Sequence, residues 1–359
     1  MKRVLIAAGG TGGHFYPGLA LAQAIKARGW QPLIAIKSED PAKPRLEAAD
    51  LAWVEIDLRG LPRGLSLETV VFAGKLLAAA AFTCRVVRDF KPDLVLGMGG
   101  YLTFPVALAA WRYNIPFALH ESNSILGLAN SAAVKLGGEL FWGLPPKSGQ
   151  GRVVGTPIRS IFFTRQEPAA ARKKLGLDPA RSTVLIFGGS QGAQTLNDLL
   201  PRQLKSSKSQ ILHLAGKGKV ETAHEAYRRE GIQATVLEYL DDMPAAYGAA
   251  DLVICRAGAS TLAELASQRK PAVLIPFPHA AANHQEANAR VFERAGAAVC
   301  VCETEFGRRM GPILFDLLES PDAPSKRAAM ASAYGSLGLP APERTTEMLM
   351  DALQSLARP

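Results

Sequence analysis

The chain has 359 residues, of which 48% are hydrophobic and 20% charged, and its mean hydropathy is +0.07. This composition excludes an intrinsically disordered protein, and the length is sufficient for two domains that each bury a core. A net charge of +9 points to an anionic partner, which could be nucleic acid, a phosphorylated small molecule or a membrane surface.

The positive charge is concentrated in the first half of the chain. Residues 1–159 hold 18 Lys and Arg against 11 Asp and Glu, whereas residues 160–359 hold 23 against 21. Basic residues flank the apolar run 76–82; they are Arg59, Arg63, Lys75, Arg85, Arg88 and Lys91. Seven apolar residues are too few to cross a bilayer, which needs about 20. Two interpretations stay open: a core helix with solvated ends, or an apolar helix face with a basic rim that rests on an anionic membrane.

The N-terminus and the cysteines both favour a cytoplasmic protein. Met1, Lys2 and Arg3 precede an apolar stretch, as in a signal peptide, but Gly9 interrupts that stretch before a usable hydrophobic region forms. The cysteines lack the spacing of a zinc or redox site and are interpreted as small reduced hydrophobic residues; they are Cys84, Cys255, Cys300 and Cys302.

Short apolar strands alternate with helical patterns along the chain, which predicts parallel βαβ units. The first unit is a strand, a glycine loop and a helix at 4–8, 9–13 and 17–28. The same order returns in the second half at 183–187, 188–192 and 193–200. This repetition predicts two related halves.

A second internal similarity supports two domains, because residues 91–100 and 249–258 follow the same pattern. The fold class expected is α/β, with two doubly wound domains and a ligand in the cleft between them. We expect the domains to be 1–158 and 159–341, with a final helix at about 342–359 that crosses back onto the first domain.

The loop Gly9-Gly10-Thr11-Gly12-Gly13-His14 can hold phosphate, because a glycine loop before a helix exposes backbone N–H groups at the positive end of the helix dipole. It matches neither the dinucleotide fingerprint nor the P-loop, and Lys37 ends the second strand where a dinucleotide site needs an acidic residue. A nicotinamide enzyme is therefore disfavoured, and a tight turn without a ligand is the alternative.

Two residues at this edge of the first sheet are candidate general bases. His14 places an imidazole beside the glycine loop, and Glu121 follows a strand. Each also has a purely structural interpretation, since His14 could cap the helix and Glu121 could be a solvated loop residue.

In the second half, small residues at 257–261 join a strand to a helix that carries Glu264. A glutamate there either complements the helix dipole or accepts the hydroxyls of a ribose whose diphosphate lies at the helix end. Asn283, His284 and Gln285 open another helix with groups suited to sugar hydroxyls.

Seven motifs in order resemble the MurG family of bacterial cell-wall glycosyltransferases. They lie at 9–14, 97–101, 120–123, 154–159, 188–193, 241–243 and 283–285. The resemblance implies the GT-B architecture, two Rossmann-like domains facing across a cleft, with the acceptor and membrane-facing domain first and the UDP-sugar donor domain second. It implies transfer of N-acetylglucosamine from UDP-GlcNAc to the 4-hydroxyl of the muramyl unit of lipid I, the undecaprenyl-diphosphate-linked muramyl pentapeptide, which yields lipid II for peptidoglycan synthesis.

The resemblance also implies roles for particular residues. Those implied to bind UDP-GlcNAc are Thr11, Gly12, Gly13, Asn123, Arg159, Ser190, Leu240, Ala259, Ser260, Thr261, Leu262, Ala263, Glu264 and Gln285. Tyr101 is implied to contact the acceptor, and His284 stands where some members carry a second Gln. Reaction with inversion is expected, with His14 as the first choice for the base and Glu121 as the second.

No tightly bound cofactor or metal is expected, because helix dipoles can hold the diphosphate and Asp241-Asp242 is better placed to start a helix than to bind an ion. The implied location is the cytoplasmic face of the plasma membrane, with an anionic membrane surface and other cell-wall synthesis proteins as partners. Nucleic acid is not expected, because no RNP-like or helix-turn-helix pattern occurs. The alternatives are another GT-B transferase that acts on a lipid or small acceptor, and a non-catalytic sugar-nucleotide sensor.

Overall fold

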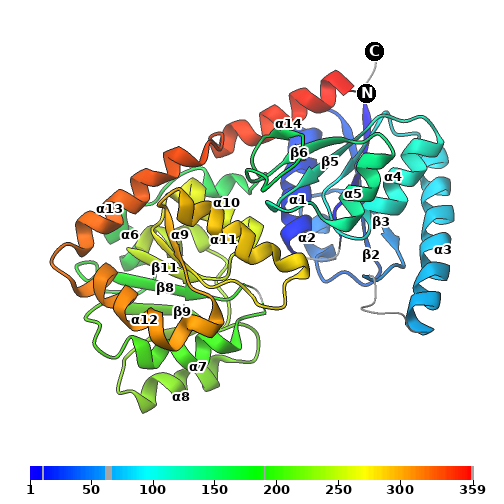
Figure 1. Ribbon diagram of the computed structural model, residues 1–359. Helices are drawn as coiled ribbons and strands as arrows, with labels where there is room; N and C mark the ends of the chain where they lie inside the picture. Colours follow the sequence, from blue (N-terminus) through cyan, green and yellow to red (C-terminus); the bar gives the residue numbers. More distant parts are fainter. Residues whose placement is uncertain (10–11, 61–66, 190, 357–359) are drawn as a thin grey trace. The chain divides into compact units, whose positions relative to one another are not determined.

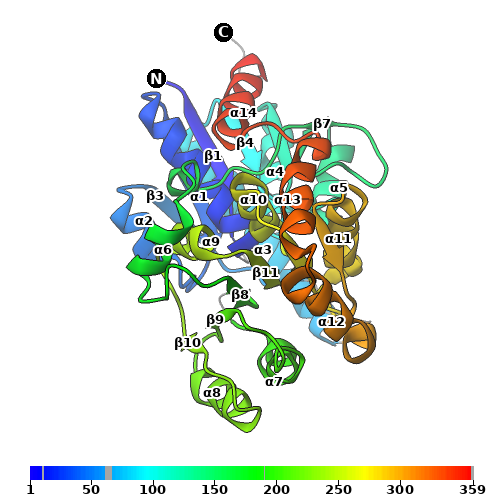
Figure 2. The ribbon, with the colours of Figure 1, turned by 90° about the vertical axis from the view of Figure 1, so that its left-hand side faces the viewer.

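The computed structural model describes residues 1–9, 12–60, 67–189 and 191–356, and they form two compact units (Figures 1 and 2). Unit 1 consists of residues 1–160 and 339–359, and unit 2 of residues 161–338. The breaks between the units lie close to the boundaries expected at 158/159 and 341/342.

Unit 1 is built on a parallel sheet with the order β3-β2-β1-β4-β5-β6-β7. Its strands are β1 (Arg3–Ala7), β2 (Gln31–Lys37), β3 (Ala52–Ile56), β4 (Leu94–Gly97), β5 (Phe117–Glu121), β6 (Glu139–Trp142) and β7 (Arg152–Val153). Alternate residues of β1 enter two different buried clusters, Val4 and Ile6 on one face and Leu5 and Ala7 on the other. Helices must therefore cover both faces; they are α1 (Gly12–Ala27), α2 (Lys43–Ala48), α3 (Leu67–Phe90), α4 (Thr103–Arg112), α5 (Leu128–Lys135) and α14 (Pro342–Leu356).

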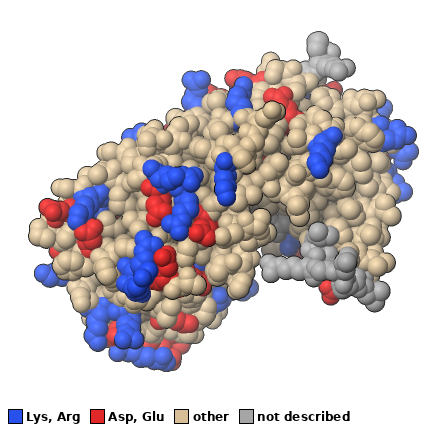
Figure 3. Space-filling model, viewed as in Figure 1, with Lys and Arg blue, Asp and Glu red and all other residues tan. Residues whose placement is uncertain are grey.

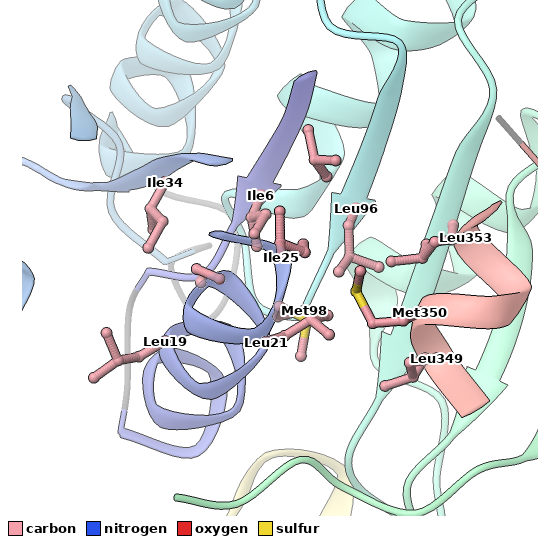
Figure 4. Close-up of a cluster of buried hydrophobic side chains, with 14 of the residues drawn as sticks. Ile6, Leu19, Leu21, Ile25, Ile34, Leu96, Met98, Leu349, Met350 and Leu353 are labelled. Carbon is pink, nitrogen blue, oxygen red and sulfur yellow. The ribbon is translucent and has the colours of Figure 1, made fainter. Parts of the chain in front are cut away.

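The last helix of the chain packs into the core of unit 1. Leu349, Met350 and Leu353 of α14 lie in the same buried cluster as Leu96 and Met98 (Figure 4). The C-terminal residues thus contribute to the fold of the unit in which the chain begins.

Helix α1 begins at Gly12, earlier than the start at Pro17 expected from the sequence. A proline inside a helix removes one backbone hydrogen bond, here the one to the carbonyl of Gly13. The earlier start places His14 in the first turn of α1.

Helix α3 is longer than the apolar run that predicted it, and it has two different faces. Ala79, Thr83 and Val87 are buried against unit 1, whereas Val70 and Leu77 are 68% and 73% exposed. By length and composition alone, Glu68–Phe90 could cross a membrane, with a mean hydropathy of 1.8. The expectation that the apolar segment is too short to cross a bilayer was therefore wrong about its length, but the buried residues of the helix pack it against α4 and β3.

Unit 2 repeats this plan with a parallel sheet in the order β10-β9-β8-β11-β12-β13. Its strands are β8 (Thr183–Phe187), β9 (Gln210–Leu214), β10 (Thr235–Leu237), β11 (Leu252–Cys255), β12 (Ala272–Leu274) and β13 (Ala298–Cys300). Its helices are α6 (Pro168–Lys174), α7 (Gln194–Gln203), α8 (Val220–Arg229), α9 (Met243–Ala249), α10 (Ala259–Gln268), α11 (His284–Arg294), α12 (Phe306–Leu314) and α13 (Ala323–Ala333). In each unit the strand order reverses at one central pair, β1/β4 or β8/β11, and ligands of such sheets bind at the carboxyl ends there.

Candidate active site

His14 lies at the point in unit 1 where the strand order reverses, against the loop that follows β4. A Cβ atom placed on Gly99 would lie 3.0 Å from Cδ2 of His14, and one placed on Gly100 would lie 2.9 Å from Nδ1. Both glycines have positive φ, +91° and +74°. The imidazole ring therefore packs closely against the two glycines. The structure thus brings together the motifs at 9–14 and 97–101.

The carboxylate of Glu121 is buried and holds its own loop together. Its Oε1 accepts hydrogen bonds from the backbone N–H and the side-chain amide of Asn123, and its Oε2 accepts from Gly127 N and Asn130 Nδ2. Only 3% of Glu121 is exposed. A carboxylate with two donors on each oxygen has little capacity left for a substrate proton, so this geometry favours His14 as the base.

Arg159 and Asn123 lie near the same edge of the unit 1 sheet. The guanidinium of Arg159 is 5.5 Å from the ring centroid of Tyr16, which lies two residues after His14 in α1. This cation–π contact places a positive charge beside the first turn of the helix. Of the first glycine loop, Gly12 and Gly13 open α1, and Thr11 is outside the described residues.

Tyr101 follows Gly100 and is half-buried. Burial raises the pKa of its hydroxyl, the nearby Asp40 carboxylate adds to that effect, and Arg59 opposes it. Tyr101 is therefore a neutral hydrogen-bonding group at physiological pH.

In unit 2 the second glycine loop is packed tightly against the loop that follows β9. A Cβ on Gly192 would lie 2.0 Å from the carbonyl oxygen of Ala215, and a Cβ on Gly188 would lie 2.3 Å from Ala193 N. Only glycine fits at either position. Ser190, which the resemblance places in this loop, is outside the described residues.

A pocket of about 500 Å³ opens at the carboxyl ends of β8, β11 and β12. Two of the residues that line it, Arg256 and Glu303, form an ion pair, with Nη2 of Arg256 2.5 Å from Oε1 of Glu303. Arg256 also donates to the carbonyls of Ile275 and Pro276 and stacks on Phe277. Arg256 was not among the site residues predicted from the sequence, although a charged residue directly after the apolar strand Leu252–Cys255 was a usable signal.

Gln285 lines the same pocket with a fixed amide. Its Oε1 accepts a hydrogen bond from Phe277 N, so the amide nitrogen is the group that it can offer as a donor. His284 is half-buried and bonds through Nδ1 to the carbonyl of Ala281.

The start of α10 carries the residues from Ala259 to Glu264 that were expected to hold diphosphate and ribose. Ser260 Oγ is buried and has no hydrogen-bond partner among the described residues. The Glu264 carboxylate is half-buried and accepts a hydrogen bond from Tyr247. Leu240 lies in the loop between β10 and α9, at the same end of the sheet.

Within the part of the chain that the structure describes, no three His, Cys, Asp or Glu residues are grouped as metal ligands. Asp242 is the N-cap of α9 and accepts from Ala245 N at 3.1 Å. Its carboxylate therefore starts a helix, as the sequence indicated.

Comparison with known proteins identifies the family. The glycosyltransferase family 28 N-terminal domain matches residues 4–137, and the family 28 C-terminal domain matches residues 183–337. A UDP-N-acetylglucosamine–N-acetylmuramyl-(pentapeptide) pyrophosphoryl-undecaprenol N-acetylglucosamine transferase of Elusimicrobium minutum is 37% identical, over 99% of this chain and 100% of that protein. The same enzyme of Desulfitobacterium hafniense is 38% identical, over 94% and 95%. The chain belongs to this MurG family of transferases.

Solved structures agree with this family. MurG of Acinetobacter baumannii is 29% identical with a TM-score of 0.81, over 99% of this chain and 100% of that one. A UDP-glucosyltransferase of Polygonum tinctorium shares the fold alone, with 13% identity, a TM-score of 0.72 and coverage of 100% and 99%. The predicted GT-B architecture of two doubly wound α/β domains is confirmed, and so is the prediction of a glycosyltransferase.

Proposed function

We propose that this chain transfers N-acetylglucosamine from UDP-GlcNAc to the 4-hydroxyl of the muramyl unit of lipid I, which gives lipid II. The observation that carries the proposal is the identity of 36–38% over nearly the whole chain to enzymes whose name states both the sugar transferred and the lipid-linked acceptor. The packing of His14 in unit 1 and the pocket of unit 2 supply groups suited to this reaction.

In the proposed reaction the acceptor oxygen attacks the anomeric carbon of the donor and the bond from that carbon to the diphosphate oxygen breaks. The electron pair of the broken bond leaves with UDP. The proton of the acceptor hydroxyl passes to His14, since imidazole is the usual proton acceptor near neutral pH. Tyr101 is proposed to contact the acceptor.

The departing diphosphate needs donors that are in place before the charge develops. Backbone N–H groups at the start of α10 and of the second glycine loop, together with Arg159, are proposed for this role. Glu264 would accept hydrogen bonds from the ribose hydroxyls. The backbone of Leu240 would hydrogen-bond to uracil, and Gln285 would bind the hydroxyls of the N-acetylglucosamine. Helix dipoles serve the diphosphate in this scheme without a divalent cation.

Helix α3 is proposed to hold the enzyme on an anionic membrane surface, at the cytoplasmic face where its lipid-linked acceptor would be met. Val70, Leu77 and Phe82 are exposed on the helix, and Arg85 and Arg88 follow them. In the view of Figure 3, Lys and Arg side chains gather at the edge of unit 1 where α3 ends. An apolar helix face with basic residues at its end is suited to the interface of an anionic bilayer.

The experiment that tests the function is transfer of labelled sugar from UDP-GlcNAc to a lipid I analogue, with UDP-glucose and UDP-N-acetylgalactosamine as competitors. The proposal expects a labelled disaccharide lipid and weak competition from both other donors. Transfer from another UDP-sugar, or to an acceptor without the muramyl unit, would identify a different GT-B transferase. UDP binding without any transfer would identify a sugar-nucleotide sensor.

A further inference from the structure

Glu264 is held by a buried tyrosine from the preceding helix. Tyr247 of α9 donates its hydroxyl to Oε2 of Glu264 at 3.0 Å. Tyr247 has no exposed surface, whereas Glu264 is half-buried at the end of the sheet where the pocket lies. One group of this pair thus lies in the core, and the other, on α10, is partly exposed.

The ring of Tyr247 is fixed on both sides by other aromatic rings. Phe162 and Phe187 each contact it edge-on, with ring centroids 6.0 Å away, and both are buried. Edge-to-face contacts between buried rings favour a particular ring orientation. The hydroxyl therefore points to Glu264 because the core holds the ring there.

The direction of the hydrogen bond is also fixed. Burial, with a further contribution from the Glu264 carboxylate, raises the pKa of Tyr247 well above its usual range. The tyrosine is therefore always the donor and the carboxylate always the acceptor. A carboxylate can accept about four hydrogen bonds, so this donor orients Glu264 without saturating it.

We propose that Tyr247 is a positioning residue for nucleotide recognition, which sets the Glu264 carboxylate to accept the ribose hydroxyls of a uridine diphosphate. The inference rests on the proposed role of Glu264 and adds to it the group that holds the carboxylate in place. A site built to pair with a hydroxyl rejects the analogue that lacks it, because the acceptor is then left unpaired. Tyr247 would thus contribute to discrimination between ribose and deoxyribose.

The test is Tyr247→Phe, which removes one oxygen and leaves both ring contacts. UDP and 2′-deoxy-UDP are titrated by calorimetry into the wild type and the variant. The matched control is Tyr334→Phe, because Tyr334 is also buried and donates its hydroxyl, but to the carbonyl of Lys270. The melting temperature of each variant monitors folding.

The wild type is expected to prefer UDP, and Tyr247→Phe is expected to reduce that preference about three- to tenfold, the effect of one lost hydrogen bond. Tyr334→Phe should leave the preference unchanged. Moreover, Tyr247→Phe should change the preference no further when made in Glu264→Ala, which lacks the acceptor.

Three outcomes would overturn the proposal. An unchanged preference in Tyr247→Phe would refute the positioning role alone, with the transferase proposal intact. An equal loss in Tyr247→Phe with and without Glu264→Ala would mean that the tyrosine does not act through Glu264. A wild type that binds UDP and 2′-deoxy-UDP equally would refute the ribose role of Glu264 as well, while the sugar-transfer experiment still decides the reaction.

Discussion

The imidazole of His14 is in contact with two glycines that come almost ninety positions later in the sequence. Both loops lie at one edge of the sheet, because each follows a strand and the two strands are parallel neighbours. The sequence could not predict the contact itself, which depends on the positive φ of Gly99 and Gly100 and on where α1 begins.

The contacts of Glu121 also could not be predicted from the sequence. The sequence offered it as a second base because it ends a strand at the correct edge. Its four hydrogen bonds come from a loop and from Asn130 of α5, and no local pattern predicts that packing. The geometry thus indicates a structural role for Glu121, whereas His14 was already the first choice for the base from the sequence and stays a prediction.

Replacement of the proposed base, His14, should lower the rate of sugar transfer and leave the binding of UDP unchanged. His14→Ala is expected to lower kcat by about 10²–10⁴-fold, the usual contribution of a positioned general base. The Kd for UDP should change little, because the imidazole is proposed to act on the acceptor. Steady-state kinetics and calorimetry measure the two quantities, and near-normal turnover would remove His14 from this role.

The glycine surface around His14 permits a second, independent test. Gly100→Ala would place a Cβ 2.9 Å from the ring and must displace it, so we expect kcat to fall at least tenfold without loss of UDP binding. Gly137→Ala is the matched control, since Gly137 also has positive φ, +98°, and lies in unit 1 with open space around its Cβ position. Equal effects of the two substitutions on kcat would mean that backbone strain alone, and not the position of His14, explains the loss.

At the scale of elements, α3 differs most from its prediction. The run 76–82 predicted a short apolar helix with basic flanks, whereas the helix covers Leu67–Phe90. Before the run, Phe72 packs against the buried cluster of unit 1 while Val70 and Val71 are exposed, and such tertiary packing is not visible in a local pattern. One face of the helix packs on unit 1, and the other face is exposed to solvent.

If α3 rests on a membrane, its exposed apolar residues should contribute to binding. Leu77→Ser is expected to weaken binding to anionic vesicles about fivefold, equivalent to about 1 kcal/mol for a partly buried leucine. Leu199→Ser, at a leucine of α7 in unit 2 that is 45% exposed, should have no effect. Sedimentation with the vesicles measures both, and equal binding by wild type and Leu77→Ser would favour a helix that serves only the fold.

For the molecule as a whole, the internal repetition of the sequence predicted the fold best. Two glycine loops in equivalent positions predicted two similar sheets, and the strand orders β3-β2-β1-β4 and β10-β9-β8-β11 share that plan. The apolar face of α14 packs into the core of unit 1, as expected. The sequence shows that this helix has an apolar face, but not which of the two cores that face contacts.

The stability of the molecule should depend on pH through a buried histidine. His213 of β9 bonds to Tyr227 and Asn197, and burial lowers its pKa to about 4. The unfolded chain binds a proton at His213 below about pH 6.5, whereas the folded protein does not until about pH 4. The free energy of unfolding should therefore fall as the pH is lowered through this range, by about 2 kcal/mol at pH 5.

Urea unfolding at pH 7 and pH 5 checks this prediction. The loss of stability between the two values should be smaller in His213→Gln, which has no titrating group at this position. An equal loss in the variant and the wild type would assign the pH dependence to other residues.

The most direct test of the account as a whole is the structure of the sugar linkage that the enzyme forms. UDP-GlcNAc and a lipid I analogue are incubated with the protein, and the disaccharide is analysed by NMR. Direct displacement by the muramyl hydroxyl predicts a β linkage from the donor sugar to the 4-position, formed with inversion of the α-linked donor. An α linkage, attachment at another hydroxyl, or no disaccharide at all would contradict the account.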